Sequence, residues 1–201
     1  EELDFAHAYV LANLASRADD ESTAVEYYRK ALEKTRVGEQ KYAVYEELAD
    51  ELRSQHKPQE AAEVLQQAVD DPSLVADLNK QVMLYYWLAF NRELAGETDK
   101  ALEAINAGMQ KVGRPVGFLQ LREAWIYYHS DQYDEAIKRF EQIAKDFADD
   151  KVIVKAAKSN LSNTYVRMGE MRKGEEVLEE IFREQPEDPG INNDLGYLYA
   201  D

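Results

Sequence analysis

Residues 124–140 read AWIYYHSDQYDEAIKRF, and in this stretch two alanines, Ala124 and Ala136, stand twelve positions apart. A large apolar residue, Phe140, follows the second alanine by four positions, and Ile143 comes three positions later. Apolar residues spaced by three and four are typical of helices, and small residues let two helices cross closely. The stretch therefore predicts a helix, a tight turn and a second helix packed against the first.

The same spacing of small and large residues recurs along the whole chain. The other instances are Ala12/Ala24/Tyr28/Ala31, Ala49/Ala61/Leu65/Ala68, Ala89/Ala101/Ile105/Gly108 and Ser162/Gly174/Leu178/Ile181. A repeat of this period predicts a stack of helix pairs in which each pair touches only its neighbours. We expect one all-α solenoid over residues 1–201, with repeats at about 5–38, 42–75, 82–115, 117–150 and 155–188 and a partial sixth at 189–201.

Turn residues support this division into helix pairs. Gly96 and Gly169 stand where the first helix of a pair should end in a left-handed residue. Pro58 falls in the expected first turn of a second helix, where its missing N–H has no cost. The extra residues at 36–41, 76–81 and 149–154 indicate longer turns or extended helix ends.

This pattern resembles the tetratricopeptide repeat, a helix–turn–helix unit of 34 residues. The resemblance covers essentially the whole chain, and residues 124–140 are the most similar unit. Repeat 4 departs from the family pattern, because Gln120 and Glu123 stand where large apolar residues are usual. The ending Asn192-Asn193-Asp194-Leu195-Gly196-Tyr197 is similar to that of many bacterial members.

The resemblance implies a right-handed superhelix whose first helices line a concave groove for a peptide or protein segment. Aromatic residues at such positions are frequent binding anchors, although the same rings also pack against the next repeat, so part of them should belong to the core. In the family register, the candidate groove residues are Glu46, Asp50, Met83, Tyr86, Phe90, Phe118, Leu121, Trp125, Tyr128 and Asn163.

Some family members bind a chaperone tail through a clamp of two lysines, one arginine and two asparagines. Over the first three repeats only Asn13 matches this clamp, and the other positions hold Tyr9, Glu47, Met83 and Trp87. The sequence therefore disfavours binding of a chaperone tail.

The charge of the chain limits the class of partner. It has 24 Lys and Arg against 40 Asp and Glu, a formal net charge of −16. Such a surface repels phosphate backbones, so we expect no nucleic acid partner. We expect a protein or peptide segment that is apolar with basic flanks, while the charge could equally serve only to keep a long solenoid soluble.

Membrane insertion and catalysis find no support in the sequence. The longest apolar run, at 82–90, is far short of the ~20 residues that span a bilayer. Cysteine is absent, so the chain has no thiolate nucleophile, and either the cytoplasm or the periplasm remains open. His7, His56 and His129 fall in three different repeats without partners at metal spacing. We expect neither an enzyme nor a cofactor or metal site.

Three functions remain open: a binding scaffold that uses the groove, a self-assembly module, and a non-catalytic accessory domain of a larger protein. The chain begins without Met and stops inside a repeat, so we expect it to be a fragment. Leu195, Gly196 and Tyr199 should then form an open apolar face on the last helix. That face predicts possible self-association through the truncated C-terminal repeat.

Overall fold

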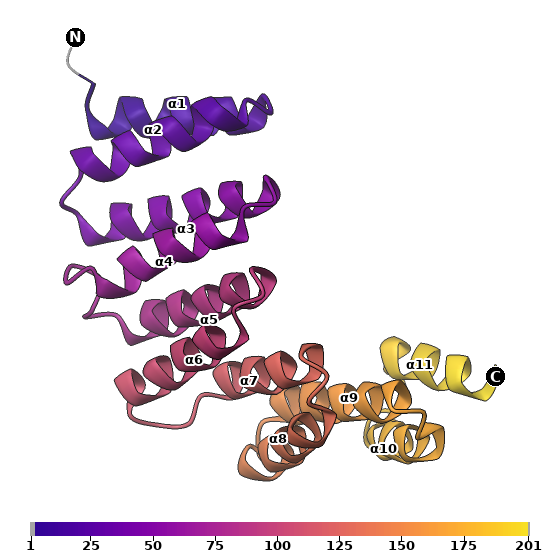
Figure 1. The fold of residues 1–201 in the computed structure, drawn as a ribbon. Coiled ribbons are helices and arrows are strands. Elements are labelled where there is room, and N and C mark those ends of the chain that lie inside the picture. Colours follow the sequence, from indigo (N-terminus) through magenta and orange to yellow (C-terminus); the bar gives the residue numbers. More distant parts are fainter. Residues whose placement is uncertain (1–2, 201) are drawn as a thin grey trace. The chain divides into compact units, whose positions relative to one another are not determined.

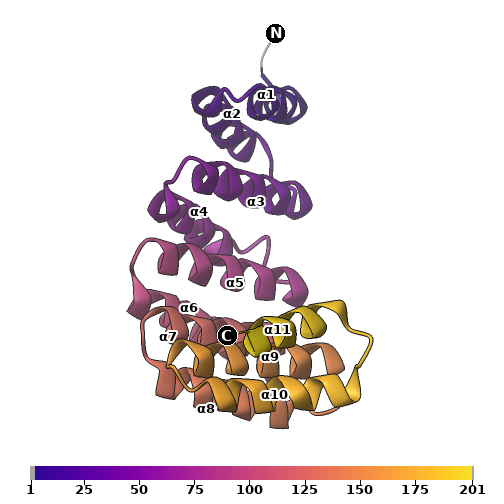
Figure 2. The same cartoon turned by 90° about the vertical axis from the view of Figure 1, so that its right-hand side faces the viewer.

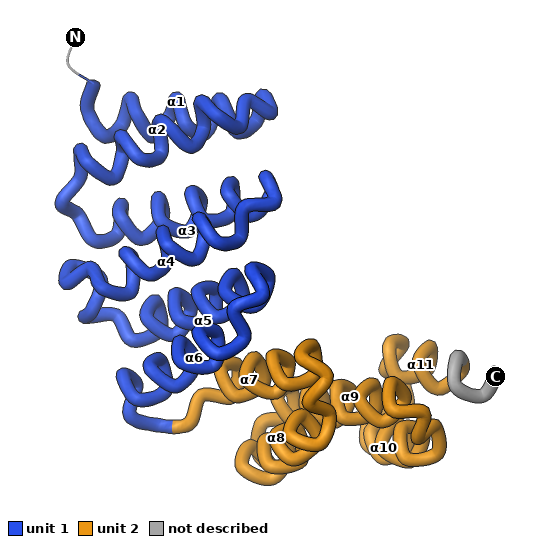
Figure 3. Tube along the Cα trace, in the orientation of Figure 1, with its two compact units in different colours: residues 1–114 blue, residues 115–201 orange. Residues whose placement is uncertain are grey.

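The computed structural model describes the backbone of residues 3–200 and the side chains of residues 3–196. Within that range it contains eleven helices and no strand, in two compact units, residues 1–114 (unit 1) and 115–201 (unit 2) (Figures 1 and 3). The helices of unit 1 are α1 (Phe5–Arg17), α2 (Glu21–Lys34), α3 (Gly38–Ser54), α4 (Pro58–Asp70), α5 (Leu78–Leu94) and α6 (Thr98–Val112). The helices of unit 2 are α7 (Gly117–His129), α8 (Tyr133–Asp146), α9 (Lys151–Arg167), α10 (Met171–Glu184) and α11 (Pro189–Ala200).

Unit 1 is a stack of three helical hairpins, in which each helix contacts the next and α3 also contacts α5 (Figures 1 and 2). The small residues of the repeat pattern lie at the crossings of the paired helices. Ala12, Ala24, Ala61, Ala89 and Ala101 are fully buried, as the spacing predicted. The larger members of the pattern fill the space beside them, and all are buried: Tyr28, Leu65 and Ile105.

Each turn inside a hairpin contains one residue with a left-handed backbone. Gly96 and Gly169 have φ of +76° and +79°, which confirms their predicted role. At the equivalent turns the chain uses Asp19, His56 and Asp131, with φ between +56° and +59°. A side chain in this region is strained, so the same turn geometry is imposed at these three positions by the packing of the flanking helices.

Three first helices are longer than the aligned repeats. Helices α3, α5 and α9 have 17 residues and begin four residues before residues 42, 82 and 155. Asp77 and Asp150 cap two of them by accepting hydrogen bonds from backbone N–H groups of the first turn. Four of the six extra residues in each noted stretch, at 38–41, 78–81 and 151–154, therefore form extended helix ends, and the two before them belong to the turns.

Unit 2 has its own apolar core between α7, α8 and α9, built around Ala124, Ala136, Phe140 and Ile143. In the next hairpin the Ser162 hydroxyl donates a hydrogen bond to the Gly174 carbonyl oxygen at 2.8 Å, which shows how closely α9 and α10 cross.

Helix α11 differs from the sequence prediction of an open apolar face that includes Leu195. Leu195 is only 6% exposed and packs with Leu178, Ile181 and Ile191 between α10 and α11. It belongs to the docked face of α11, and the predicted open apolar face does not include it. Gly196 is exposed, and the side chain of Tyr199 lies outside the described residues.

Candidate functional site

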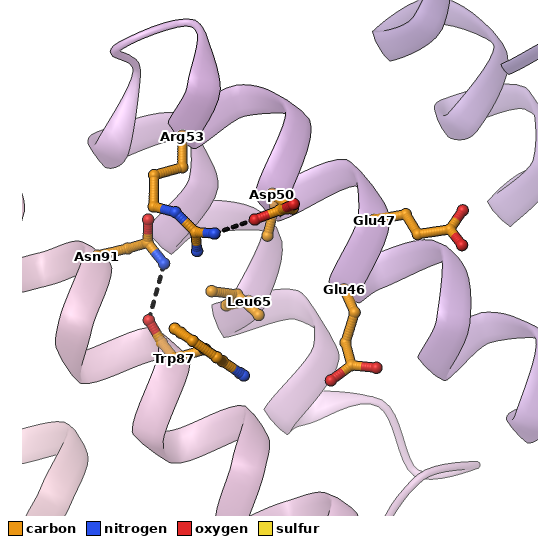
Figure 4. A pocket seen from close by; sticks show the side chains of 8 residues that line it. Glu46, Glu47, Asp50, Arg53, Leu65, Trp87 and Asn91 are labelled. Atoms are coloured by element: carbon orange, nitrogen blue, oxygen red, sulfur yellow. Dashed lines mark hydrogen bonds and ion pairs between the residues drawn. The ribbon is translucent and has the colours of Figure 1, made fainter. Parts of the chain in front are cut away.

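Helices α3 and α5 of unit 1 contact each other and, with Leu65 of α4, line an open pocket of about 240 Å³ (Figure 4). We call it the α3–α5 pocket. Its lining residues are Glu46, Glu47, Ala49, Asp50, Arg53, Leu65, Trp87 and Asn91. Ala49 and Leu65 are buried and give the pocket an apolar floor, whereas the remaining residues are polar or aromatic.

The carboxylates of the pocket come from one side of α3. Val44, Leu48 and Leu52 recur at a spacing of four and bury the opposite side of this helix. Glu46 and Asp50 stand two positions after Val44 and Leu48, on the other side of the helix, where they are half-buried and exposed, respectively. Glu46 accepts a hydrogen bond from the Tyr42 hydroxyl at 2.7 Å, which holds its carboxylate at the pocket.

Helix α5 supplies the aromatic wall and a buried amide. Trp87 lies edge to face with Tyr86 and Phe90, with ring centroids 5.1 Å and 5.7 Å apart. One turn further on, Asn91 donates from Nδ2 to the Trp87 carbonyl oxygen at 2.9 Å. Asn91 is 0% exposed, and its Oδ1 has no hydrogen-bond partner among the described residues.

Arg53 lies between the two helices. Its guanidinium pairs with the Asp50 carboxylate and lies 5.3 Å from the Trp87 ring centroid and 5.7 Å from that of Phe90 (Figure 4). A guanidinium over aromatic faces is a favourable cation–π arrangement. The pocket therefore already contains one cation that belongs to the protein.

A second hollow of about 540 Å³ adjoins the first and shares Glu47 and Asp50 with it. We call it the α1–α3 pocket. Its other lining residues are Asn13, Ser16, Arg17, Asp19, Glu21, Tyr28, Glu51 and Ser54. The carboxylates here are held in place by α1, because the Tyr9 hydroxyl donates to Glu47 at 2.7 Å and the Ser16 hydroxyl to Glu51 at 2.7 Å. Burial and this bond to the Glu47 carboxylate raise the pKa of the Tyr9 phenol.

Unit 2 contains an aromatic cluster around Trp125. Its ring lies 5.0 Å from Tyr128, 4.9 Å from His129 and 6.4 Å from the core ring of Phe140, centroid to centroid. Burial, with a smaller contribution from Arg122, lowers the pKa of His129. The Trp125 ring therefore joins the core of unit 2 to its surface.

The predicted groove residues fall into two sets, one in each unit. In unit 1, Glu46 and Asp50 line the α3–α5 pocket, while Tyr86 and Phe90 are not among its lining residues but contact the Trp87 ring. Met83 is exposed but outside the pocket lining.

In unit 2, Phe118 is 59% exposed and Asn163 is also exposed. Trp125 and Tyr128 are half-buried. The prediction of Leu121 as a groove residue is wrong. Leu121 is 8% exposed and belongs to the core with Ala157 and Leu161, so it offers no surface to a ligand.

Sequence reasoning missed Trp87 and Asn91 as pocket residues. Both stand one position beyond the groove positions of the family register, on the side of α5 that faces α3. Their spacing of four residues places them on the same helix face, and this was the available signal. This spacing predicts a pocket only when it is known that α3 and α5 approach each other.

Comparisons with known proteins agree with this architecture. A sequence profile described as "Tetratricopeptide repeat" matches residues 119–150, the unit formed by α7 and α8. A search of curated proteins found no match to the sequence.

Solved structures with the same fold are numerous, and three illustrate the likeness. A tetratricopeptide repeat protein from Parabacteroides merdae has 18% identity, covers 97% of this chain and 72% of its own, and gives a TM-score of 0.66. MamA has 14% identity, with 90% and 92% covered and a TM-score of 0.62. YrrB, described as a TPR protein with an unusual peptide-binding site, has 17% identity, with 95% and 91% covered and a TM-score of 0.54.

The chain therefore contains a tetratricopeptide repeat at residues 119–150 and has the α-solenoid fold of tetratricopeptide-repeat proteins. None of the helices that the structure describes combines the length and apolar character needed to cross a membrane. Over the same residues, no group of three or more His, Asp or Glu side chains is placed to hold a metal ion.

Proposed function

We propose that this protein is a binding scaffold and that the face formed by α1, α3 and α5 of unit 1 holds a peptide or protein segment. The supporting observation is the pair of adjoining pockets on this face. Their lining contains six carboxylates and two guanidinium groups, a net charge of −4. A segment with basic residues fits this charge, and electrostatic attraction of this kind speeds association.

The two pockets differ in character, and this suggests what each could hold. The α3–α5 pocket has an apolar floor and the Trp87 ring, which suit a side chain with apolar surface. The α1–α3 pocket is lined mainly by polar groups, which suit a basic side chain near the first. The described peptide-binding site of YrrB, a protein with the same fold, is a precedent for this use.

A selection of random displayed peptides against the full chain tests the proposal. Trp87→Ala should weaken the selected peptides by more than ~1 kcal/mol, as loss of an aromatic anchor does. Trp125→Ala is the matched control, because it removes the other tryptophan of the chain, in unit 2. Circular dichroism should confirm that both variants are folded. Peptides that respond to Trp125 alone would place binding on unit 2, and failure to select any peptide would contradict the proposal.

Glu46→Lys tests the electrostatic part of the proposal. The substitution reverses one charge at the rim of the α3–α5 pocket. It should lower the association rate and its dependence on salt more than it changes the dissociation rate. Stopped-flow fluorescence with a labelled peptide at two salt concentrations measures both rates.

Self-association is the second candidate, and one feature of unit 2 favours it. A hollow of about 360 Å³ between α10 and α11 is lined in part by Phe182 and Leu195, and Phe182 is 36% exposed. A second copy could cover this apolar surface. Light scattering after size exclusion should then show a dimer that Phe182→Glu dissociates, whereas a monomer would remove this candidate.

A further inference from the structure

The α3–α5 pocket contains a buried acceptor to which no group in the described part of the chain donates a hydrogen bond. Asn91 is fully buried, and its amide N–H₂ is directed to the Trp87 carbonyl oxygen by a 2.9 Å hydrogen bond. Among the residues that the structure describes, none donates a hydrogen bond to its Oδ1, although the side chain lines the pocket (Figure 4). Buried acceptors are nearly always paired in folded proteins. A ligand that fits this pocket should therefore donate a hydrogen bond to Asn91 Oδ1.

The walls of the pocket restrict the ligand further. Trp87 offers the face of an indole ring, and Ala49 and Leu65 form an apolar floor. The protein's own Arg53 shows that this wall accepts a guanidinium, because its guanidinium lies over Trp87 and Phe90 while Asp50 balances its charge. An incoming group must therefore take the part of the half-buried Trp87 ring that Arg53 leaves open.

The charge that remains in the pocket belongs to Glu46 and Glu47, since Asp50 is paired with Arg53. Glu47 is held toward α1 by the Tyr9 hydroxyl. Glu46 is bound through Oε1 to the Tyr42 hydroxyl. The Glu46 carboxylate is thus the pocket's counter-charge for an incoming cation.

Four kinds of ligand side chain can be compared for their fit to the indole ring, the buried acceptor and the carboxylate of this pocket. A carboxylate is repelled by the net negative charge, and an alkyl group leaves Asn91 Oδ1 without a donor. An ammonium group supplies charge and donors but has no flat face to lie on the indole ring. A guanidinium has a flat, weakly hydrated face and several N–H donors in its plane, so its chemistry matches that of Trp87, Asn91 and Glu46.

We propose that the α3–α5 pocket binds the arginine side chain of a partner segment. This inference rests on the proposed function, because it names the residue that the scaffold recognises. The guanidinium stacks on Trp87, donates to Asn91 Oδ1 and is balanced in charge by Glu46.

The test uses the full chain and a fluorescent peptide obtained by the selection described above. The selected peptides should share an arginine. Replacement of this arginine by lysine, or by its neutral analogue citrulline, should each weaken binding about tenfold, as for lost hydrogen bonds to a charged group. On the protein, Asn91→Leu should weaken the arginine peptide by a similar factor and have much less effect on the lysine peptide. Asn106→Leu, at an exposed position of α6, is the matched control and should change neither.

Asn91→Leu removes an unpaired acceptor and replaces it with an apolar group of similar size, so the fold should tolerate it. If the variant does not fold, the peptide substitutions and Glu46→Gln still test the inference. Glu46→Gln removes the charge that balances the guanidinium, so it should weaken the arginine peptide. Peptides that depend on Trp87 but bind equally well with lysine in place of arginine would overturn this inference and leave the proposed function intact. Absence of any Trp87-dependent peptide would overturn both.

Discussion

At the scale of single residues, the turns inside the hairpins show how the fold overrides residue preference. Five such turns have a left-handed residue, and only two of these residues are glycines. His56 has φ of +59° and is exposed, so its side chain contributes strain without packing. Gly96 occupies the same place one hairpin later, and a Cβ there would meet nothing within 4 Å.

Introducing a glycine at position 56 and removing the glycine at position 96 should have opposite effects on the free energy of unfolding. His56→Gly should raise the free energy of unfolding by about 1 kcal/mol, because it relieves the left-handed strain. Gly96→Ala should lower it by about 1 kcal/mol for the same reason. Urea unfolding followed by circular dichroism measures both, and equal signs would contradict this account of the turns.

A second residue-scale prediction concerns Glu123, one of the two residues that depart from the family pattern in repeat 4. Burial raises the pKa of its carboxyl above the ordinary value of 4.5, and Arg139 at 3.4 Å opposes the shift only in part. The folded chain therefore holds the proton more tightly than the unfolded chain. This contribution to stability is greatest below pH 4.5 and declines as pH rises from 4.5 through the raised pKa.

Glu123→Gln should remove this decline. Relative to wild type, the variant should therefore gain stability between pH 4 and pH 7. Glu135 is the control with the opposite sign, because hydrogen bonding from Lys138 lowers its pKa below 4.5. Its stabilisation is present above pH 4.5 and is lost as pH falls, so Glu135→Gln should be slightly less stable than wild type at pH 7 only. Thermal midpoints across this pH range distinguish the two patterns.

At the scale of elements, the close crossing of paired helices depends on small residues at defined positions. A Cβ added to Gly174 would lie 2.8 Å from Val166 Cγ2 and 3.1 Å from the Ser162 carbonyl oxygen. Both groups belong to α9, so α10 could accept a larger residue only by moving away. The small residues of the repeat pattern therefore indicate where paired helices approach each other closely.

Two glycines in helices of unit 2 provide a matched test of this reading. Gly174→Ala should destabilise the protein by about 1–3 kcal/mol, as overpacking does, despite the better helix propensity of alanine. Gly196→Ala, where a Cβ would meet nothing within 4 Å, should be neutral or stabilising by up to about 1 kcal/mol. If thermal melting shows the same change for both, propensity and not the crossing distance governs Gly174.

At the scale of the whole molecule, residues 1–114 form a compact unit with their own core. A repeat protein is stabilised by contacts between neighbouring hairpins, so a set of three hairpins is expected to fold. We predict that residues 1–114 expressed alone are helical, melt cooperatively and bind the selected peptides as the full chain does. A non-cooperative melt would show that unit 1 needs unit 2, and loss of binding by a folded unit 1 would move the site elsewhere.

The sequence by itself determined the helix pairs, because their signals are local. One helical hairpin is predicted from the spacing of Ala124, Ala136 and Phe140 alone. The turns of two other hairpins are predicted from Gly96 and Gly169. Periodicity at three and four positions depends only on helix geometry, so it survives without knowledge of neighbouring repeats.

Tertiary structure alone decided which outward residues meet. Glu46 and Asp50 were predicted as groove residues, but their partners Trp87 and Asn91 come from a helix about 40 positions away in the chain. Leu121 and Leu195 were predicted on open faces, yet packing against neighbouring helices buries both. Contacts between one repeat and the next depend on how the helices are rotated about their axes, and a rotation of one residue position, about 100°, exchanges a surface residue for a core residue.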